Sequence, residues 1–250
     1  MQYHLDTIPV WESMEWKNEC PLCGLARKTE LEVVERALGA SVMEPNERIK
    51  VNKHGMCRQH HQMLFAQQNR LGHALLMDSR GKELRAALKP LAQKAKDASG
   101  VKGSLFAKNL PNESLIDALH ELTCHCVVCE TIATHMARYR YTFLHLWKTD
   151  ATFQAAWRNS KGVCLHHTKE LLQSAREHLS RQKQSEFADE ALTHLINQLT
   201  QDGEDLDWFT RKFDYRNQDQ PWGNSKTALE RMVNRERGWC LGDEPYPRKK

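Results

Sequence analysis

The residues best able to do chemistry are cysteines and histidines that occur in pairs separated by two other residues. Each half of the chain carries one Cys-x-x-Cys pair followed by one Cys-x-x-His pair. The predicted quartets are Cys20/Cys23/Cys57/His60 and Cys126/Cys129/Cys164/His167. Thiolates and imidazoles are the usual ligands of structural zinc, and four of them complete its tetrahedral shell. The spacing therefore predicts two Zn2+ ions, one in each quartet.

The ligand positions recur at an almost constant distance along the chain. Cys20 and Cys126 are 106 positions apart, and Cys57 and Cys164 are 107 positions apart. Recurrence of several residues at one period indicates an internal repeat. We therefore expect two similar modules, each of which closes its metal site with its own four ligands.

Other interpretations of these residues stay open. Iron, or an iron-sulfur cluster, can be held by three thiolates and an imidazole as zinc can. Cys20 and Cys23 could form a redox dithiol, although no βαβ pattern surrounds them. The eight side chains could also be buried free cysteines and unrelated histidines. Cys124 could compete for the second ion, and Cys240 has no partner in the pattern.

The elements that must position these ligands are predicted to be helices. Leucines and valines recur at helical spacing and no convincing alternating strand is present, so the predicted fold class is all-α. Asp150 is expected to cap a short helix, and one long helix is expected from His166 towards Leu199. Small residues at 99–104 suggest a break. The predicted domains are residues 1–104 and 105–203, the two metal-binding repeats, followed by residues 204–250.

The last segment differs in character from the helical repeats. Aromatic residues are scattered there among Asp, Asn, Gly and Pro, which predicts an irregular extension packed on the helices. Opposite charges lie beside aromatic side chains, and this predicts a functional surface made by Asp214, Tyr215, Arg216 and Trp222. The alternative is structural: the aromatic residues anchor a tail, and Asp214 pairs with Arg216.

Composition restricts the class of protein. The net charge is only +4, with 36 basic and 32 acidic residues. So small an excess of positive charge is poor evidence for a nucleic-acid-binding protein. The stretch from Arg80 to Lys108 contains eight basic residues and only two acidic ones. This local positive charge keeps nucleic-acid binding open as a weaker possibility. No apolar run is long enough for a membrane span and no secretion signal is evident, so we expect a soluble, cytoplasmic protein without a membrane partner.

The motifs resemble those of a bacterial family of uncharacterised proteins, the domain of unknown function 6062 family. The resemblance rests on Cys20-Pro21-Leu22-Cys23, on Gly162-Val163-Cys164-Leu165-His166-His167, and on Lys212-Phe213-Asp214-Tyr215-Arg216-Asn217 followed by Pro221-Trp222-Gly223. It covers most of the chain. The second cysteine pair has Val127 where the family commonly has proline, which affects the stiffness of the turn more than ligation. The resemblance implies bacterial origin and metal binding, and supplies no reaction.

These observations favour an interaction or ligand-binding scaffold over an enzyme. The sequence has no Gly-x-Ser-x-Gly, His-Glu-x-x-His or phosphate-binding glycine loop. A catalytic zinc leaves one coordination position open, whereas each quartet can fill all four. The expected partner is a protein or an unidentified ligand. The alternative function is an iron-sulfur or redox-active enzyme or factor that uses the same Cys/His quartets or the C-terminal segment.

Overall fold

A computed structural model describes residues 3–100 and 111–247, and this part of the chain contains helices and no strand. The predicted all-α class is confirmed. The α-helices are α1 (Tyr3–Met14), α2 (Pro21–Leu38), α3 (Pro45–His54), α4 (Arg58–Ala66), α5 (Arg70–Gly100), α6 (Pro111–Thr123), α7 (Val127–Thr149), α8 (Ala151–Asn159), α9 (Leu165–His178), α10 (Arg181–Arg211) and α11 (Ala228–Arg237). Short 3-10 helices lie at η1 (Ala40–Met43), η2 (Tyr215–Asn217) and η3 (Ser225–Thr227).

Side-chain caps explain where several of these helices begin. Asp150 accepts hydrogen bonds from the backbone N–H groups of Thr152 and Phe153 at 2.8 and 3.2 Å, as predicted for the start of α8. The single long helix expected from His166 to Leu199 is wrong. Ser180 has an extended backbone and its hydroxyl accepts a bond from Lys183 N–H, so α9 ends and α10 begins there.

The C-terminal segment is more helical than predicted. α10 continues to Arg211, and the ten residues of α11 follow the 3-10 helices, so the connections between them and residues 238–247 are the irregular parts. α11 is rich in charged and polar residues, and polar as well as apolar side chains face inward from it. Asn234 and Arg235 are buried there, beside Asp202 of α10.

The helices follow one another at the spacing already seen for the ligands. α2 and α7 begin 106 positions apart, α3 and α8 also 106, and α4 and α9 107; α5 and α10 have 31 residues each. The same order of helices therefore accompanies each set of Cys and His pairs.

The chain folds as two compact units. Unit 1 is Met1–Thr29 with Thr134–Lys250, and unit 2 is Glu30–Ala133. The chain passes between the units within α2 and within α7. The predicted boundary between residues 104 and 105 lies outside the described residues, as does the expected break from residue 101 onwards, so the predicted domain ranges stay a prediction.

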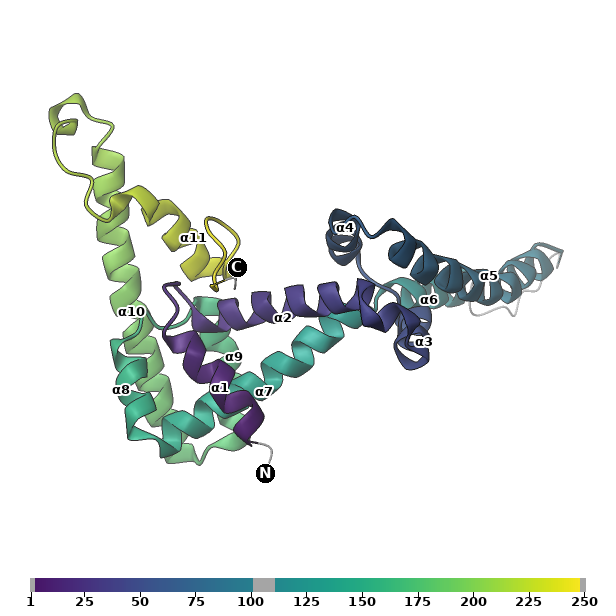
Figure 1. Ribbon diagram of the computed structural model, residues 1–250, viewed down its shortest axis with the longest axis horizontal. Helices are drawn as coiled ribbons and strands as arrows, with labels where there is room; N and C mark the ends of the chain where they lie inside the picture. Colours follow the sequence, from purple (N-terminus) through teal and green to yellow (C-terminus); the bar gives the residue numbers. More distant parts are fainter. Residues whose placement is uncertain (1–2, 101–110, 248–250) are drawn as a thin grey trace, which may run out of the picture. The chain divides into compact units, whose positions relative to one another are not determined.

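Aromatic side chains form the core of unit 1. Phe143 of α7 meets Phe153 and Trp157 of α8 edge to face, with ring centroids 5.1 and 5.3 Å apart. Phe187 of α10 packs against Trp147 from the other side at 5.0 Å. α9 and α11 both pack on α10 (Figure 1). Such aromatic pairs contribute about 0.5–1.5 kcal/mol each beyond the area they bury.

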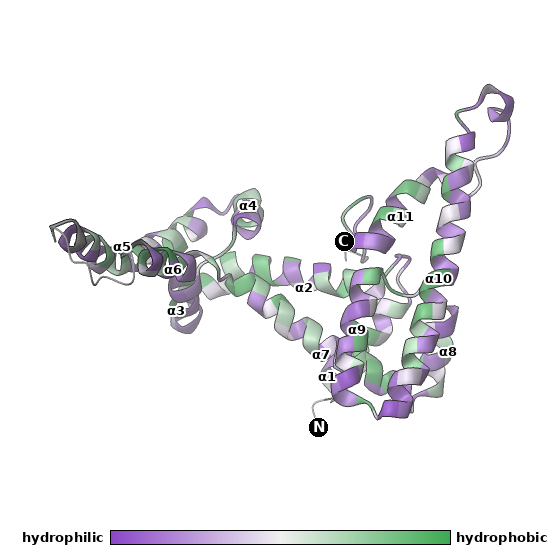
Figure 2. Ribbon diagram, turned by 180° about the vertical axis from the view of Figure 1, so that it is seen from behind, coloured by the Kyte–Doolittle hydropathy of each residue, from purple (hydrophilic) through white to green (hydrophobic). Residues whose placement is uncertain are grey.

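Unit 2 has an aliphatic core. Val34, Leu38, Val51, Leu64 and Leu76 bring together the end of α2 with α3, α4 and α5. Cys126 and Val128, at the start of α7, belong to the same cluster. Nowhere in the described chain does a helix reach the length and apolarity of a bilayer span, and polar residues interrupt each long helix (Figure 2).

Candidate metal centres

The eight predicted ligands converge in two groups, but not in the groups predicted. Site 1, in unit 1, consists of Cys20, Cys23, Cys164 and His167; site 2, in unit 2, consists of Cys57, His60, Cys126 and Cys129. The prediction that each half closes its own quartet is therefore wrong. Each Cys-x-x-Cys pair meets the Cys-x-x-His pair of the other half. Both combinations contain three cysteines and one histidine, so the spacing could not distinguish them.

Helix starts position the ligands of site 1. Cys20 precedes α2 and Cys23 lies in its first turn; Cys164 is the N-cap of α9, and His167 lies in the first turn of that helix. Residues three apart at a helix start point to the same side. Gly162, with φ of +71°, supplies the left-handed turn that brings the chain into Cys164.

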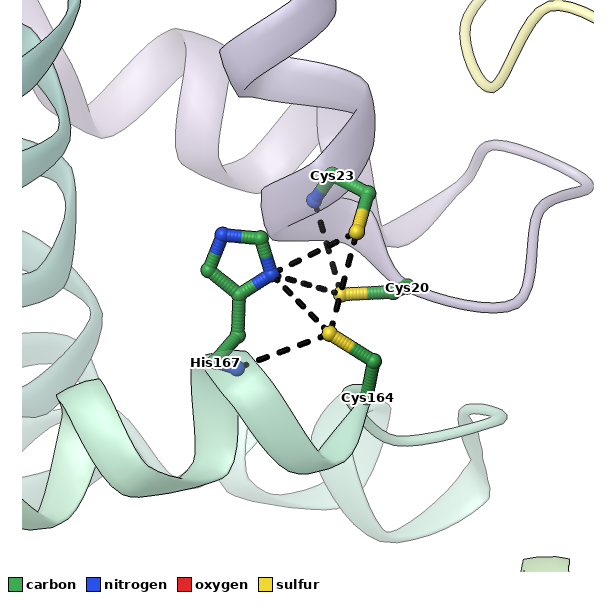
Figure 3. Close-up of side chains that lie close together, drawn as sticks. All are labelled: Cys20, Cys23, Cys164 and His167. Carbon is green, nitrogen blue, oxygen red and sulfur yellow. Dashed lines mark hydrogen bonds between the residues drawn. The ribbon is translucent and has the colours of Figure 1, made fainter. Parts of the chain in front are cut away.

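The atoms of site 1 surround one point (Figure 3). His167 Nδ1 lies 3.4 Å from the sulfurs of Cys20 and Cys23 and 3.2 Å from that of Cys164. The sulfurs of Cys23 and Cys164 are 3.8 Å apart. Zinc bonds of about 2.3 Å to sulfur and about 2.0 Å to nitrogen, in a tetrahedron, require separations of about 3.8 and about 3.5 Å. The group therefore fits a single tetrahedral ion.

Site 2 has the same geometry from different helices. Cys57 is the N-cap of α4, with His60 in its first turn; Cys126 precedes α7, and Cys129 lies in its first turn. His60 Nδ1 is 3.1, 3.3 and 3.5 Å from the sulfurs of Cys57, Cys126 and Cys129. The sulfurs of Cys57 and Cys129 are 4.0 Å apart. In a multi-iron cluster the four ligands are divided among different irons, so some of them lie further apart than the ligand atoms of these sites do. Each site therefore fits a single ion.

Backbone amides support the sulfurs of site 1. Cys23 N–H donates to Cys20 Sγ at 3.4 Å, and His167 N–H donates to Cys164 Sγ at 3.5 Å. A third donor comes from the segment after α11, where Trp239 N–H lies 3.2 Å from Cys23 Sγ. These donors and the two helix N-termini favour the thiolate form that a metal needs.

A buried arginine joins the two turns of site 1, and sequence reasoning missed it. Arg235 donates from Nη1 to the carbonyls of Glu19 and Lys161 at 2.9 and 2.7 Å, and these residues lie just before the two ligand pairs. Its other nitrogens bond the carboxylates of Glu19 and Asp202 at 3.0 and 3.1 Å. Its charge would normally place Arg235 on the surface, and only the three-dimensional fold reveals this role.

Arg80 has the corresponding role in unit 2. It donates to the backbone carbonyls of Asn52, Lys53 and Leu122, so it ties the end of α3 to the end of α6. Burial lowers the pKa of this guanidinium. Arg80 begins the basic stretch considered for phosphate binding, but it is 6% exposed and fully engaged with carbonyls. That stretch is therefore a weaker nucleic-acid candidate than its composition suggests.

A carboxylate orients the histidine ligand of site 2. Glu30 Oε1 lies 3.1 Å from His60 Nε2, on the ring edge opposite the sulfurs. Metal-binding histidines commonly make such a contact, which fixes the ring and its tautomer. His167 has a longer counterpart, with Glu170 Oε2 at 3.9 Å from its Nε2.

Each quartet holds opposite charges when no ion is bound. Burial lowers the pKa of His60, but the hydrogen bonds that its ring donates to Cys126 and to Glu30 outweigh burial and raise that pKa to about 10. Burial raises the pKa of Cys126, but the bond from His60 and backbone donors lower it to about 6. Burial and the neighbouring thiolates raise the pKa of Cys129 to about 12. An incoming cation must therefore displace the protons of His60 and Cys129.

Site 1 behaves in the same way. Burial lowers the pKa of His167, but the hydrogen bonds that its ring donates to the Cys164 and Cys23 sulfurs raise that pKa to about 10. Hydrogen bonds from Cys20 and Cys23 strongly lower the pKa of Cys164, whereas burial raises that of Cys20 well above its usual range. Metal binding at this site also exchanges protons for the ion.

The two sites differ in access from solvent. All four ligands of site 1 are buried, and the segment from Gly238 passes close to the sulfurs of Cys23 and Cys164. Gly238 has φ of +89°, which other residues rarely adopt. In site 2, Cys57 is only half-buried and Cys129 is exposed.

The predicted C-terminal surface contributes no ligand to either quartet. Asp214 and Arg216 form an exposed ion pair at 2.6 Å, Tyr215 is 79% exposed, and Trp222 packs against Phe209 with ring centroids 5.9 Å apart. The other two cysteines stay outside the quartets as predicted, and both Cys124 and Cys240 are exposed.

Comparison with known proteins identifies a family without a described activity. The model of DUF6062, a family of unknown function, matches residues 1–243. This confirms the resemblance seen in the Cys-Pro-Leu-Cys, Gly-Val-Cys-Leu-His-His and Lys-Phe-Asp-Tyr-Arg-Asn motifs. No curated protein and no solved structure matches the chain.

Pairs of cysteine substitutions test how the ligands are grouped. Cys20→Ser with Cys164→Ser removes two ligands of site 1, and we expect the variant to lose about one metal ion per chain, because site 2 stays whole. Cys20→Ser with Cys57→Ser damages both sites, and we expect it to lose about two. Metal content per chain, measured by mass spectrometry, checks this. If the first variant lost two ions and the second lost one, the ligands would instead be grouped within each half of the chain.

The difference in burial predicts that site 2 releases its metal first. In excess chelator, we expect metal to leave the protein in two kinetic phases, because solvent access controls metal exchange. Release from site 2 should be faster than release from site 1 by roughly tenfold or more. The variant Cys57→Ser with Cys126→Ser should lack the fast phase and keep the slow one. Release is followed with a metal-sensitive dye. A single phase in the parent protein, or loss of the slow phase in this variant, would contradict the prediction.

Proposed function

We propose that this chain, which belongs to the DUF6062 family of unknown function, is a helical interaction scaffold stabilised by two structural zinc ions. The observation that carries the proposal is that each quartet has four ligands within 4.8 Å of one another around one point. Such a site fills its own tetrahedron and leaves no position for substrate. A structural ion therefore suits the geometry better than a catalytic one.

Zinc is preferred over iron on the chemistry of the ligands. Three thiolates and one imidazole at mononuclear spacing match a common structural zinc site, and zinc needs no redox partner. Mononuclear iron could occupy the same tetrahedron and is the alternative. Because the cysteines must stay reduced to bind either ion, we propose that the protein works in the cytoplasm.

The recurrence of ligands and helices supports an origin by duplication. The helices α2 to α4 recur as α7 to α9 at 106 or 107 positions. In the proposed arrangement, the copies are interlocked, since each supplies the Cys-x-x-Cys pair to one site and the Cys-x-x-His pair to the other. The metals thereby tie the copies together.

The proposed contact surface is the loop at the end of α10, residues 213–222. Lys212 is 4% exposed, and its Nζ donates to the carbonyls of Asn217, Gln218 and Gln220 at 2.5, 2.7 and 2.6 Å. Three carbonyls around one ammonium hold the loop in a single shape. Figure 1 places this loop at the end of α10 remote from α8.

Exposed aromatic groups give this loop its binding character. Phe213 is 71% exposed and Tyr215 is 79% exposed, although both are large. Tyr215 lies beside the Arg216 guanidinium, with its carbon 6.0 Å from the ring. Tyrosine and arginine are enriched among residues that dominate protein interfaces. A protein partner therefore suits this surface better than nucleic acid, because Asp214 already pairs with Arg216.

Metal analysis of protein purified without oxygen tests the structural role. We expect about two zinc ions per chain, a colourless protein, and loss of helical circular dichroism on complete metal removal, since ligation of this kind contributes about 10–16 kcal/mol in small zinc peptides. Cobalt substitution should produce strong thiolate-to-metal absorption. A brown protein containing iron would establish the alternative, and full helicity without metal would refute the structural role.

Site-specific photo-crosslinking tests the contact surface. A benzophenone amino acid in place of Tyr215 should capture a defined protein in the native cell extract, whereas the same group in place of Ile196, which is 61% exposed on α10, should not. Adding Lys212→Met should abolish the capture with metal content unchanged, because the carbonyls lose their shared donor. Equal products from both positions, or products that survive Lys212→Met, would contradict this role.

A further inference from the structure

Three side chains outside the quartets converge on the surface of unit 2. His54 Nδ1 and His125 Nδ1 each lie 3.1 Å from the same oxygen, Oε1 of Glu130. The two imidazoles meet edge to face, with centroids 5.1 Å apart. Their side chains are 27%, 42% and 47% exposed, in the order His54, His125, Glu130, so water reaches all three.

The backbone beneath these side chains is held in place. His54 is the last residue of α3, and the carbonyl of the next residue, Gly55, accepts a hydrogen bond from Val127 N–H at 3.1 Å. Arg80 bonds the carbonyls of Lys53 and Leu122, close to His54 and to His125. The end of α3, which carries His54, and the segment between α6 and α7, which carries His125, are therefore fixed against each other before any ligand binds.

A second carboxylate orients one of the imidazoles. Glu121 Oε2 lies 3.5 Å from Nε2 of His125, on the ring edge opposite Nδ1. A carboxylate at that nitrogen favours the tautomer whose Nδ1 lone pair is free to bind a metal. This is the outer contact that metal-binding histidines commonly have.

We propose that His54, His125 and Glu130 form a third metal site, open to water, that takes a divalent first-row transition ion such as Zn2+ or Ni2+. Two imidazole nitrogens and a carboxylate oxygen are suitable ligands for these ions. Bonds of about 2.0–2.2 Å place ligand atoms about 2.8–3.1 Å apart at octahedral angles and about 3.3–3.6 Å apart at tetrahedral angles. The 3.1 Å between each imidazole nitrogen and Glu130 Oε1 fits the octahedral range. Three protein ligands leave the remaining positions to water or to a small ligand.

Titration of Ni2+ into the full-length protein, with both quartets occupied by zinc, tests this site. We expect one further ion per chain, measured by calorimetry, without release of zinc to a zinc-sensitive dye. Glu130→Gln and His54→Gln should each weaken this binding by roughly tenfold or more, since even outer-shell changes cost that much. His120→Gln, an exposed histidine on α6, is the matched control and should bind as the parent does.

Two substitutions keep the test decisive if one disturbs folding, and the zinc content and circular dichroism of each variant are measured first. Three results would overturn the assignment. They are no further ion in the parent protein, zinc released in proportion to Ni2+ bound, and unchanged affinity in the folded Glu130→Gln or His54→Gln variant. Loss of binding in Cys124→Ser would also overturn it, because the ion would then lie at the neighbouring Glu121/Cys124/His125 group.

Discussion

Convergence of four metal ligands at each site is the constraint on which the rest of the molecule depends. The two turns of site 1 are separated by 141 positions between Cys23 and Cys164, and those of site 2 by 72 between Cys57 and Cys129. A metal ion bound at each site would join turns that lie far apart in the sequence. A zinc ion contributes about 10–16 kcal/mol in small peptides, comparable with the roughly 5–15 kcal/mol stability of a whole domain.

Buried arginines extend this constraint into the protein around the ions. Arg235 bonds the carbonyls that precede both ligand pairs of site 1, and Arg80 bonds those beside site 2. A buried guanidinium is costly unless all its donors are used, so both turns must keep their shape for the arginine to stay satisfied. At each site, the buried arginine thus favours the same arrangement of the two turns that a bound metal ion would require.

Residue type and local spacing carried most of what could be predicted from the sequence. The eight ligands are recognisable because thiols and imidazoles three apart are rare without a purpose, and Asp150 because its cap acts on the next three residues. The pairing of Cys20/Cys23 with Cys164/His167 could not be predicted, since a Cys-x-x-Cys pair offers the same three cysteines and one histidine with either Cys-x-x-His pair.

Features that depend on tertiary contacts were beyond sequence reasoning. α11 was hidden because Asn234 and Arg235, as well as apolar residues, face inward. Arg80 and Arg235 resemble ordinary surface charges until their carbonyl partners are known. His54 is 71 positions from His125, so no local pattern connects them.

The exchange of ligand pairs has a consequence for synthesis on the ribosome. Site 2 is complete once Cys129 has emerged, whereas site 1 must wait for His167 and receives its cover only at Trp239. Until His167 emerges, Cys20 and Cys23 lack their native partner pair, and Cys57 and His60 are the first complementary pair to follow them out of the ribosome. A nascent chain that captures zinc early would close on this incorrect quartet. Correct folding would then require the ion to be released and bound again, so a metal that stabilises the finished protein would also be a source of kinetic trapping during translation.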